Sequence, residues 1–194
     1  MNGGLAIAIL AAGSARRFGG GKLDAELNGR PLGSYAVAAV RALGKPKIMV
    51  GRPIPDFASA ALALGEATLL KNRRAEEGLG TSVALAAMQA SAAGADALLL
   101  LAADMPLVRA ETLAALVAAV GEHPSAVLHP DGHPGIPACF PPGWYAKLAG
   151  LEGDQGAGKL LRDAEVTLVE VGPDELRDVD RPEDLSGIPL SKLR

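Results

Sequence analysis

A glycine-rich stretch, residues 10–22, is suited to binding a bulky anion. It contains four glycines together with Arg16, Arg17 and Lys22. Glycine lets the backbone turn with positive φ and bring its N–H groups close to an anion, and cationic side chains pair with phosphate oxygens. We therefore expect this stretch to wrap the phosphates of a nucleoside triphosphate. The alternative is an ordinary flexible turn between a strand and a helix.

The stretch matches neither of two common phosphate-binding signatures. Lys22 is followed by Leu23 and lacks the glycine spacing of a Walker A loop, and no G-x-G-x-x-G pattern is present. Residues 153–159 do fit G-x-x-x-x-G-K, but Leu160 stands where a Ser or Thr would hold Mg²⁺. The residues before them, 146–151, are predicted to be helical rather than a strand, so we reject this segment as a P-loop.

A second candidate site is Asp104, which ends the apolar run Leu-Leu-Leu-Leu-Ala-Ala that begins at Leu98. In open α/β sheets, ligands bind beyond the carboxyl ends of the strands, where Asp104 would stand. A carboxylate there is well placed to hold Mg²⁺ against triphosphate oxygens. The alternative is that Asp104 only caps the following turn or helix.

The elements that must position these residues alternate between short apolar runs and longer helical patterns, which is typical of βαβ units. Strands are predicted at residues 5–10, 47–50, 68–70, 97–102, 126–128 and 166–171. Helices are predicted at residues 31–43, 57–64, 82–93 and 109–120. The fold class predicted is α/β, a Rossmann-like three-layer α/β/α arrangement around a mostly parallel sheet.

The C-terminal third is less regular. Residues 129–142 are rich in Pro, Gly and His and are predicted to form a binding loop, followed by short helices at 144–148 and 156–161. No repeat, linker or charge run divides the chain, so we expect one domain over residues 1–194.

Composition limits the class of partner. The 194 residues carry 19 basic and 22 acidic side chains, and aromatic residues make up 3%. This balance indicates neither a nucleic-acid nor a membrane partner. One cysteine, Cys139, with no targeting segment, predicts a cytoplasmic location.

Together these stretches resemble the MobA-like nucleotidyltransferases of the molybdenum-cofactor branch. Residues 10–22 match the family pattern L-A-[AG]-G, then R-[MF]-G and a lysine. The likeness continues in the family's order through nearly the whole chain, at residues 28–32, 72, 78–82, 104–107, 132–134, 153–157 and 178–185.

The resemblance implies a role for each matched residue. Arg17, Lys22 and Asp104 would be catalytic, and the base and ribose would lie near Ala11, Ala12 and Ser82. The implied nucleotide-binding set is Leu10, Ala11, Ala12, Gly13, Ser14, Arg16, Arg17, Lys22, Ser82 and Asp104. Asp104 would be the principal Mg²⁺ ligand and Asp180 a second one, although Asp180 could instead, or also, cap a helix at residues 182–185.

The resemblance also bears on the substrates. The Ala12 variant of the loop, L-A-A-G, is similar to the cytidine-using branch, the molybdenum cofactor cytidylyltransferases, whereas the guanosine-using branch has L-A-G-G. His133 and Asp154 match motifs near the acceptor, molybdopterin or molybdenum cofactor. Residues 135–138 depart from the family's direct run into an apolar strand, so His133 could be only a loop residue, and Asp154 could be only a helix cap.

The implied reaction is transfer of CMP from CTP to the terminal phosphate of molybdopterin, with release of pyrophosphate. Positioning and charge neutralisation do most of such chemistry, so no nucleophilic side chain is required. Three alternatives stay open: a same-fold transferase using GTP or another phosphorylated acceptor, an NAD(P)H-dependent dye reductase, and a protein that delivers molybdenum cofactor to a molybdenum hydroxylase apoenzyme.

Overall fold

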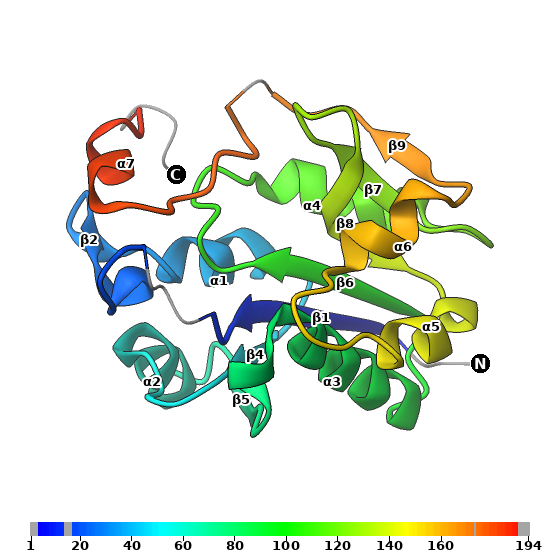
Figure 1. Cartoon of the computed structure of the whole chain (residues 1–194), viewed down its shortest axis with the longest axis horizontal. Coiled ribbons are helices and arrows are strands. Elements are labelled where there is room, and N and C mark those ends of the chain that lie inside the picture. Colours follow the sequence, from blue (N-terminus) through cyan, green and yellow to red (C-terminus); the bar gives the residue numbers. More distant parts are fainter. Residues whose placement is uncertain (1–3, 14–16, 173, 190–194) are drawn as a thin grey trace.

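The computed structural model describes residues 4–13, 17–172 and 174–189, and its centre is one seven-stranded sheet (Figure 1). The strand order is β5-β4-β1-β6-β8-β7-β9, and β8 alone runs antiparallel to both of its neighbours in this sheet. A small antiparallel pair, β2 and β3, lies outside it. The strands are β1 Leu5–Ala11, β2 Glu26–Leu27, β3 Arg30–Pro31, β4 Lys47–Val50, β5 Thr68–Lys71, β6 Ala97–Ala102, β7 Ser125–Leu128, β8 Pro134–Phe140 and β9 Thr167–Val169.

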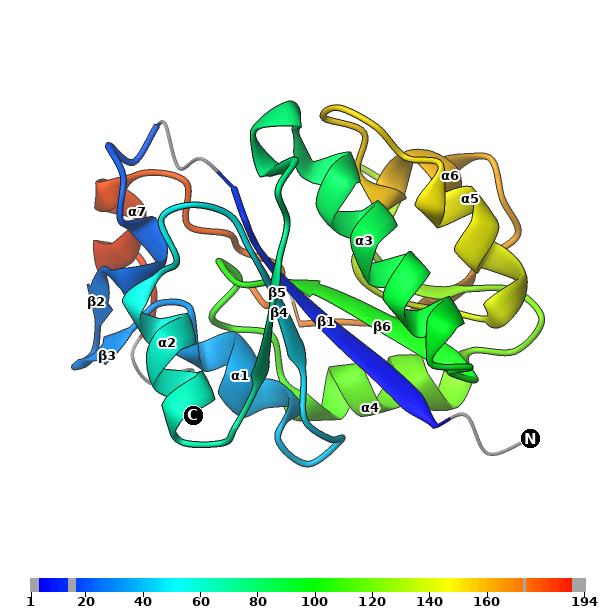
Figure 2. The same ribbon diagram turned by 90° about the horizontal axis from the view of Figure 1, so that it is seen from below.

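Helices cover both faces of the sheet, which confirms the three-layer prediction (Figure 2). Ile7 and Ile9 of β1 pack toward the layer of α1, α2 and α4, whereas Ala8 and Leu10 pack toward α3, α5 and α6. Burial on both faces explains the continuous apolar runs of the central strands. The helices are α1 Ser34–Val40, α2 Asp56–Ala63, α3 Leu79–Ala92, α4 Ala110–Ala119, α5 Tyr145–Ala149, α6 Ala157–Arg162 and α7 Pro182–Ser186.

The prediction of a loop over residues 129–142 is wrong for its second half, because β8 lies there in the interior of the sheet. Proline in a strand is confined to edges and bulges, so the prolines of this segment hid the strand. The structure contains such a bulge: Ala126 pairs with Ala138 but Val127 pairs with Gly135. The two residues skipped on β8, Ile136 and Pro137, therefore need no partner on β7.

Two helices also start three residues away from their predicted starts. Helix α1 begins at Ser34 rather than residue 31, because Pro31 belongs to the β2–β3 pair. Helix α3 begins at Leu79, three residues before the predicted start at Ser82. Among the described residues, no helix has the length and apolar character needed to cross a membrane.

The carboxyl ends of three parallel strands bring the candidate site residues together. Ala11 of β1 pairs with Val50 of β4, and Leu10 pairs with Ala102 of β6. The loop after β1, the residue Gly51 and the residue Asp104 consequently lie at the same edge of the sheet, as expected for ligand binding in this architecture.

The segment after β9 returns across this edge and is fixed at two places. The Val179 N–H donates to the Asp104 carbonyl oxygen at 3.0 Å, and the Val179 side chain is fully buried in a cluster with Leu107 and Tyr35. Upstream, the carboxylate of Glu175, only 4% exposed, accepts hydrogen bonds from Arg109 at the start of α4.

Glu175 gives a stability prediction with a pH signature. Burial raises the pKa of its carboxyl, but hydrogen bonds from the Thr112 hydroxyl, the Arg109 backbone and guanidinium and the Gly172 N–H outweigh burial, and the net pKa is lowered. We expect Glu175→Gln to reduce the free energy of unfolding by about 1–3 kcal/mol at neutral pH. A lowered pKa means that this stabilisation is complete above the ordinary glutamate pKa of about 4.3 and is lost as the pH falls through the folded-state value.

Urea titrations of both proteins from pH 7 to pH 3 would measure this. The gap between wild type and variant should shrink in the acid range. A gap that stays constant across the series would rule out an ionised Glu175 as its source.

Candidate active site

The last glycines of the glycine-rich stretch turn the backbone directly before Lys22. Gly19, Gly20 and Gly21 have φ values of 87°, 99° and 62°, which L side chains adopt reluctantly. The short 3₁₀ helix Lys22–Asp24 follows. Ser14 and Arg16 fall outside the described residues, so their predicted roles are not placed by the structure.

Asp24 anchors this loop to the neighbouring helix. Its carboxylate accepts hydrogen bonds from the N–H groups of Asp56, at 2.9 Å, and Phe57, at 2.8 Å, in the first turn of α2. Unpaired N–H groups and the positive end of the helix dipole both favour a carboxylate there. The backbone that carries Lys22 is therefore held in place independently of any ligand.

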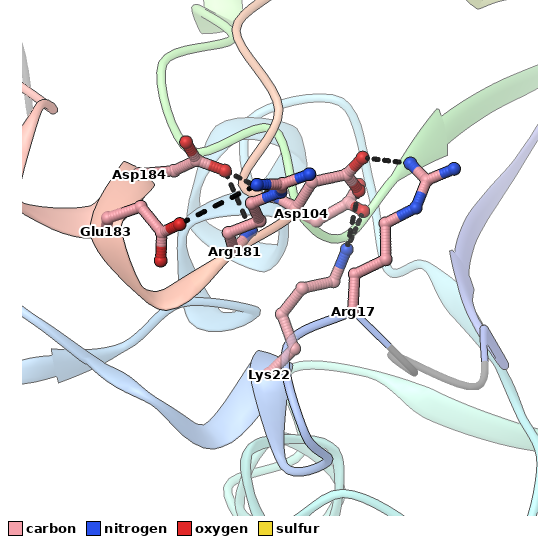
Figure 3. A network of polar contacts seen from close by, with 7 residues as sticks. Arg17, Lys22, Asp104, Arg181, Glu183 and Asp184 are labelled. Carbon is pink, nitrogen blue, oxygen red and sulfur yellow. Dashed lines mark hydrogen bonds and ion pairs between the residues drawn. The ribbon is translucent and has the colours of Figure 1, made fainter.

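The residues expected to be catalytic form one network of opposite charges (Figure 3). The Lys22 Nζ lies 2.6 Å from Asp104 Oδ2 and 3.7 Å from Asp180 Oδ1. An Arg17 guanidinium nitrogen lies 2.9 Å from Asp180 Oδ2. The Lys22 side chain is only 11% exposed, against 75% for Arg17. The structure thus brings together Arg17, Lys22, Asp104 and Asp180, which are far apart in the sequence.

The carboxylate of Asp180 faces these cations rather than capping α7. The carboxylate that closes the start of α7 belongs to Asp184, which accepts hydrogen bonds from the N–H groups of Asp180 and Arg181 at 2.9 and 2.7 Å. The alternative prediction, that the Asp180 side chain caps this helix, is therefore wrong. The carboxylate oxygens of Asp180 contact Arg17 and Lys22 instead.

Sequence reasoning missed Asp178, a third carboxylate near the network. Loss of hydration raises the pKa of its carboxyl, and the negative charges of Asp104 and Asp180 raise it further. Asp178 and Asp180 flank the buried Val179. That Asp-Val-Asp pattern, with its two carboxylates on either side of one apolar residue, was the available signal.

The donor set suits a divalent cation that arrives with a substrate. Within the described ranges, no three His, Cys, Asp or Glu side chains form a group that could hold a metal ion by themselves. Asp104 and Asp180, however, already share one cation, the Lys22 ammonium. Mg²⁺ is commonly bound by one or two carboxylates plus substrate phosphates, so these two residues fit it.

A cavity of about 580 Å³ opens beside this network, and we call it the loop cavity. Its walls are residues 10–13, 20–24, 51–56, 75, 76, 79, 102, 104 and 136. A Cβ at Gly51 would lie 3.1 Å from the Ala75 Cβ and 3.5 Å from the Ala12 carbonyl oxygen, so the residues around Gly51 pack closely in this part of the wall. The predicted residues Leu10, Ala11, Ala12, Gly13, Lys22 and Asp104 all line it.

A second cavity of about 500 Å³, the hairpin cavity, adjoins the first and shares Leu10, Leu79 and Ile136 with it. It is lined by residues of the β7–β8 hairpin and by residues 154–159 and 162. His133 and Asp154, the predicted acceptor residues, both lie on its wall. Lys159 and Arg162 line it as well and were missed, although Lys159 ends the rejected P-loop pattern. That rejection agrees with the structure, because helix α5 precedes the segment.

Ser82 reaches neither cavity wall. It is 2% exposed, and its hydroxyl accepts a hydrogen bond from the Asn72 side chain at 2.9 Å. The same amide donates to the Thr81 hydroxyl, which in turn donates to the Gly78 carbonyl. These bonds order the turn into α3, so Ser82 contacts this turn rather than the loop cavity.

Two glycines join this turn to the wall of the hairpin cavity. The Gly80 N–H donates to the Gly153 carbonyl oxygen at 2.8 Å. A Cβ at Gly78 would lie 2.3 Å from the Gly153 carbonyl, and one at Gly80 would lie 2.8 Å from the Glu152 oxygen. Backbone therefore packs directly on backbone, and the walls of the two cavities are fixed to each other.

Comparison with known proteins identifies the family of the chain. The family described as "MobA-like NTP transferase domain" matches residues 7–170. The chain belongs to this family.

Two curated relatives and one solved structure are similar to most of the chain. The purine catabolism protein PucB of Bacillus subtilis is 31% identical over 91% of each chain. The phosphoenolpyruvate guanylyltransferase of Rubrobacter xylanophilus is 35% identical over 80% of this chain and 76% of its own. The Mycobacterium tuberculosis protein Rv0371c shares the fold with a TM-score of 0.77, at 22% identity over 95% and 96% of the chains, and a second structure of it is a manganese complex.

This MobA-like chain is thus a nucleotidyltransferase that uses nucleoside triphosphates, and its fold is the one predicted. The family match ends at residue 170, so Asp178 and Asp180 lie beyond it. Their place in the site comes from the structure.

The backbone packing at Gly80 predicts a specific sensitivity. We expect Gly80→Ala to reduce the free energy of unfolding by about 1–3 kcal/mol, because its Cβ would overlap backbone atoms that cannot rotate away. Gly150→Ala is the matched control, since its Cβ would meet the Lys147 oxygen at an ordinary 3.5 Å. Chemical denaturation measures both variants. Equal stability of the two would contradict the close packing of Gly80 on residues 152–155.

Proposed function

We propose that this MobA-like protein is a Mg²⁺-dependent cytidylyltransferase that transfers CMP from CTP to molybdopterin or to its molybdenum-loaded form. The observation that carries the proposal is the pair of adjoining cavities, one bordered by the glycine-rich loop, Lys22 and Asp104, the other by His133 and Asp154. CTP would occupy the loop cavity and the acceptor the hairpin cavity.

In the proposed reaction, an oxygen of the acceptor's terminal phosphate forms a bond to the α-phosphorus of CTP. The bond from that phosphorus to the bridging oxygen of the β-phosphate breaks, and pyrophosphate leaves with the electron pair. The glycine-rich loop and the cations Arg17 and Lys22 bind the triphosphate and stabilise charge on the leaving group. Asp104 and Asp180 would hold Mg²⁺, which supplies Lewis-acid stabilisation of the phosphate oxygens when bound.

The acceptor would lie across the shared wall of Leu10, Leu79 and Ile136. Within the described part of the chain, neither Lys159 nor Arg162 has an ion-pair partner, so both are available to an anionic acceptor. His129 has a structural role here, because its ring nitrogen Nε2 lies 2.8 Å from the Ile136 carbonyl oxygen. His133 and Asp154 would orient the acceptor's polar groups.

The choice of CTP rests on Ala12, which lines the loop cavity together with Gly51 and Ala75. GTP is the second candidate, because a relative at 35% identity is named a guanylyltransferase. Thermal unfolding with each nucleotide and Mg²⁺ separates them. A ligand at 100 times its Kd adds roughly 2.7 kcal/mol to stability, so CTP should raise the melting temperature more than GTP does. A larger shift with GTP would overturn the base assignment.

The reaction itself is tested by incubating the protein with each nucleoside triphosphate, Mg²⁺ and molybdopterin, and detecting the dinucleotide product by mass. We expect the cytidine dinucleotide to form and pyrophosphate to be released. Absence of product with every nucleotide would overturn molybdopterin as the acceptor.

Asp104 is expected to be indispensable in this assay. Asp104→Asn should lower the rate by about 10²-fold or more, because it removes the charged ligand that would hold the Mg²⁺ against the reacting phosphates. Asp163→Asn, an exposed position outside both cavities, is the control. Folding of both variants is checked by circular dichroism. Full activity in folded Asp104→Asn would remove the metal assignment.

A further inference from the structure

The Lys22 ammonium occupies the place where a shared cation would bind Asp104 and Asp180 (Figure 3). Its contacts with the two carboxylates, 2.6 and 3.7 Å, are direct. Arg17 engages the remaining oxygen of Asp180 at 2.9 Å. Two cations thus neutralise two carboxylates before any substrate is present.

We infer that Lys22 keeps divalent cations out of the free protein, and that the triphosphate admits the metal by attracting Lys22 to itself. A metal ion alone would have to displace an ammonium that is 11% exposed and would then lack a partner. Leaving such a charge unpaired is unfavourable. The inference rests on the proposed function only in taking a triphosphate as the ligand.

The triphosphate changes this balance because it offers new partners to both cations. Once Lys22 and Arg17 pair with phosphate oxygens, Asp104 and Asp180 are free to accept a divalent cation. Metal and nucleotide would then each strengthen binding of the other by the same factor. A protein built in this way binds the metal–nucleotide complex in preference to either component.

The local structure permits the lysine to move while its backbone stays fixed. Asp24 ties the loop to α2, and the Leu23 carbonyl oxygen accepts a hydrogen bond from the Gly33 N–H at 2.9 Å. The side chain itself is a flexible four-carbon stem with a compact charge at its end. Movement of the ammonium from carboxylate to phosphate therefore requires side-chain rotation alone.

The test is a titration of the protein with Mn²⁺ alone. Binding is measured from the decrease in the electron paramagnetic resonance signal of free Mn²⁺. Lys22→Met keeps the apolar stem and removes the charge, and we expect it to bind Mn²⁺ at least about tenfold more tightly than wild type. Lys147→Met is the charge-matched control, because Lys147 stacks on Trp144 and lines neither cavity. The control should bind Mn²⁺ as wild type does.

Adding Asp180→Asn to Lys22→Met should abolish the gain, which locates the metal at the carboxylate pair. Calorimetric titration of CTP in Mn²⁺ and in EDTA gives the coupling between the two ligands. The metal should improve CTP binding by a larger factor in wild type than in Lys22→Met. Circular dichroism verifies folding, and Lys22→Gln replaces Lys22→Met if the latter does not fold.

A Mn²⁺ affinity in folded Lys22→Met or Lys22→Gln that equals or falls below that of wild type overturns the inference. The outcome is separable from the proposed function, because Mn²⁺ binding needs neither a particular base nor an acceptor. Tighter Mn²⁺ binding by the variant, without CMP transfer by the wild type, would contradict only the proposed function. CMP transfer by the wild type, with Mn²⁺ affinity unchanged in Lys22→Met, would contradict only the inferred role of Lys22.

Discussion

One backbone hydrogen bond, from the Val179 N–H to the Asp104 carbonyl oxygen, joins the C-terminal segment to the end of β6. It sets the distance between two carboxylates that would otherwise belong to unrelated parts of the chain. Burial of the Val179 side chain fixes the direction of the segment, so Asp178 and Asp180 come close to Asp104. The cation network, and the edge of the loop cavity that it borders, depend on this contact.

Repulsion among these acidic groups is offset locally by Lys22 and Arg17, not by burial in a pre-formed metal cage. Such a cage would need further ligands and would bind ions permanently. A pair of carboxylates neutralised by side-chain cations needs no bound metal ion to offset its charge. The rigid parts of the site are elsewhere, in the capped start of α2 and in the glycine packing between the turn into α3 and residues 152–155.

An element or residue could be predicted from the sequence where its signal lies in the local pattern of residues, and not where it depends on tertiary contacts. Strands buried on both faces, such as β1 and β6, are continuous apolar runs and were predicted correctly. Strand β8 was missed because it contains Pro137, which is accommodated by a bulge that depends on pairing with β7. Asp104 was found from its place after a strand. Lys159 and Arg162 were missed because only tertiary contacts bring them to the hairpin cavity. Asp178 was missed although the Asp-Val-Asp pattern was a signal for it, and Ser82 was assigned to the nucleotide although the fold buries it.

The family match covers the strands of the main sheet, apart from the first two residues of β1, but stops before the segment that carries Asp180. The positions of Asp104 and Asp180 are therefore not equally constrained by the packing of the sheet. Moving Asp104 would require shifting β6 within the core, whereas Asp180 lies on a strap outside the sheet. Insertions or substitutions in that strap can change where the Asp180 carboxylate lies relative to Lys22 and Arg17 while the core stays intact. The arrangement of charges at this edge of the sheet is in that sense adjustable from residues 174–189.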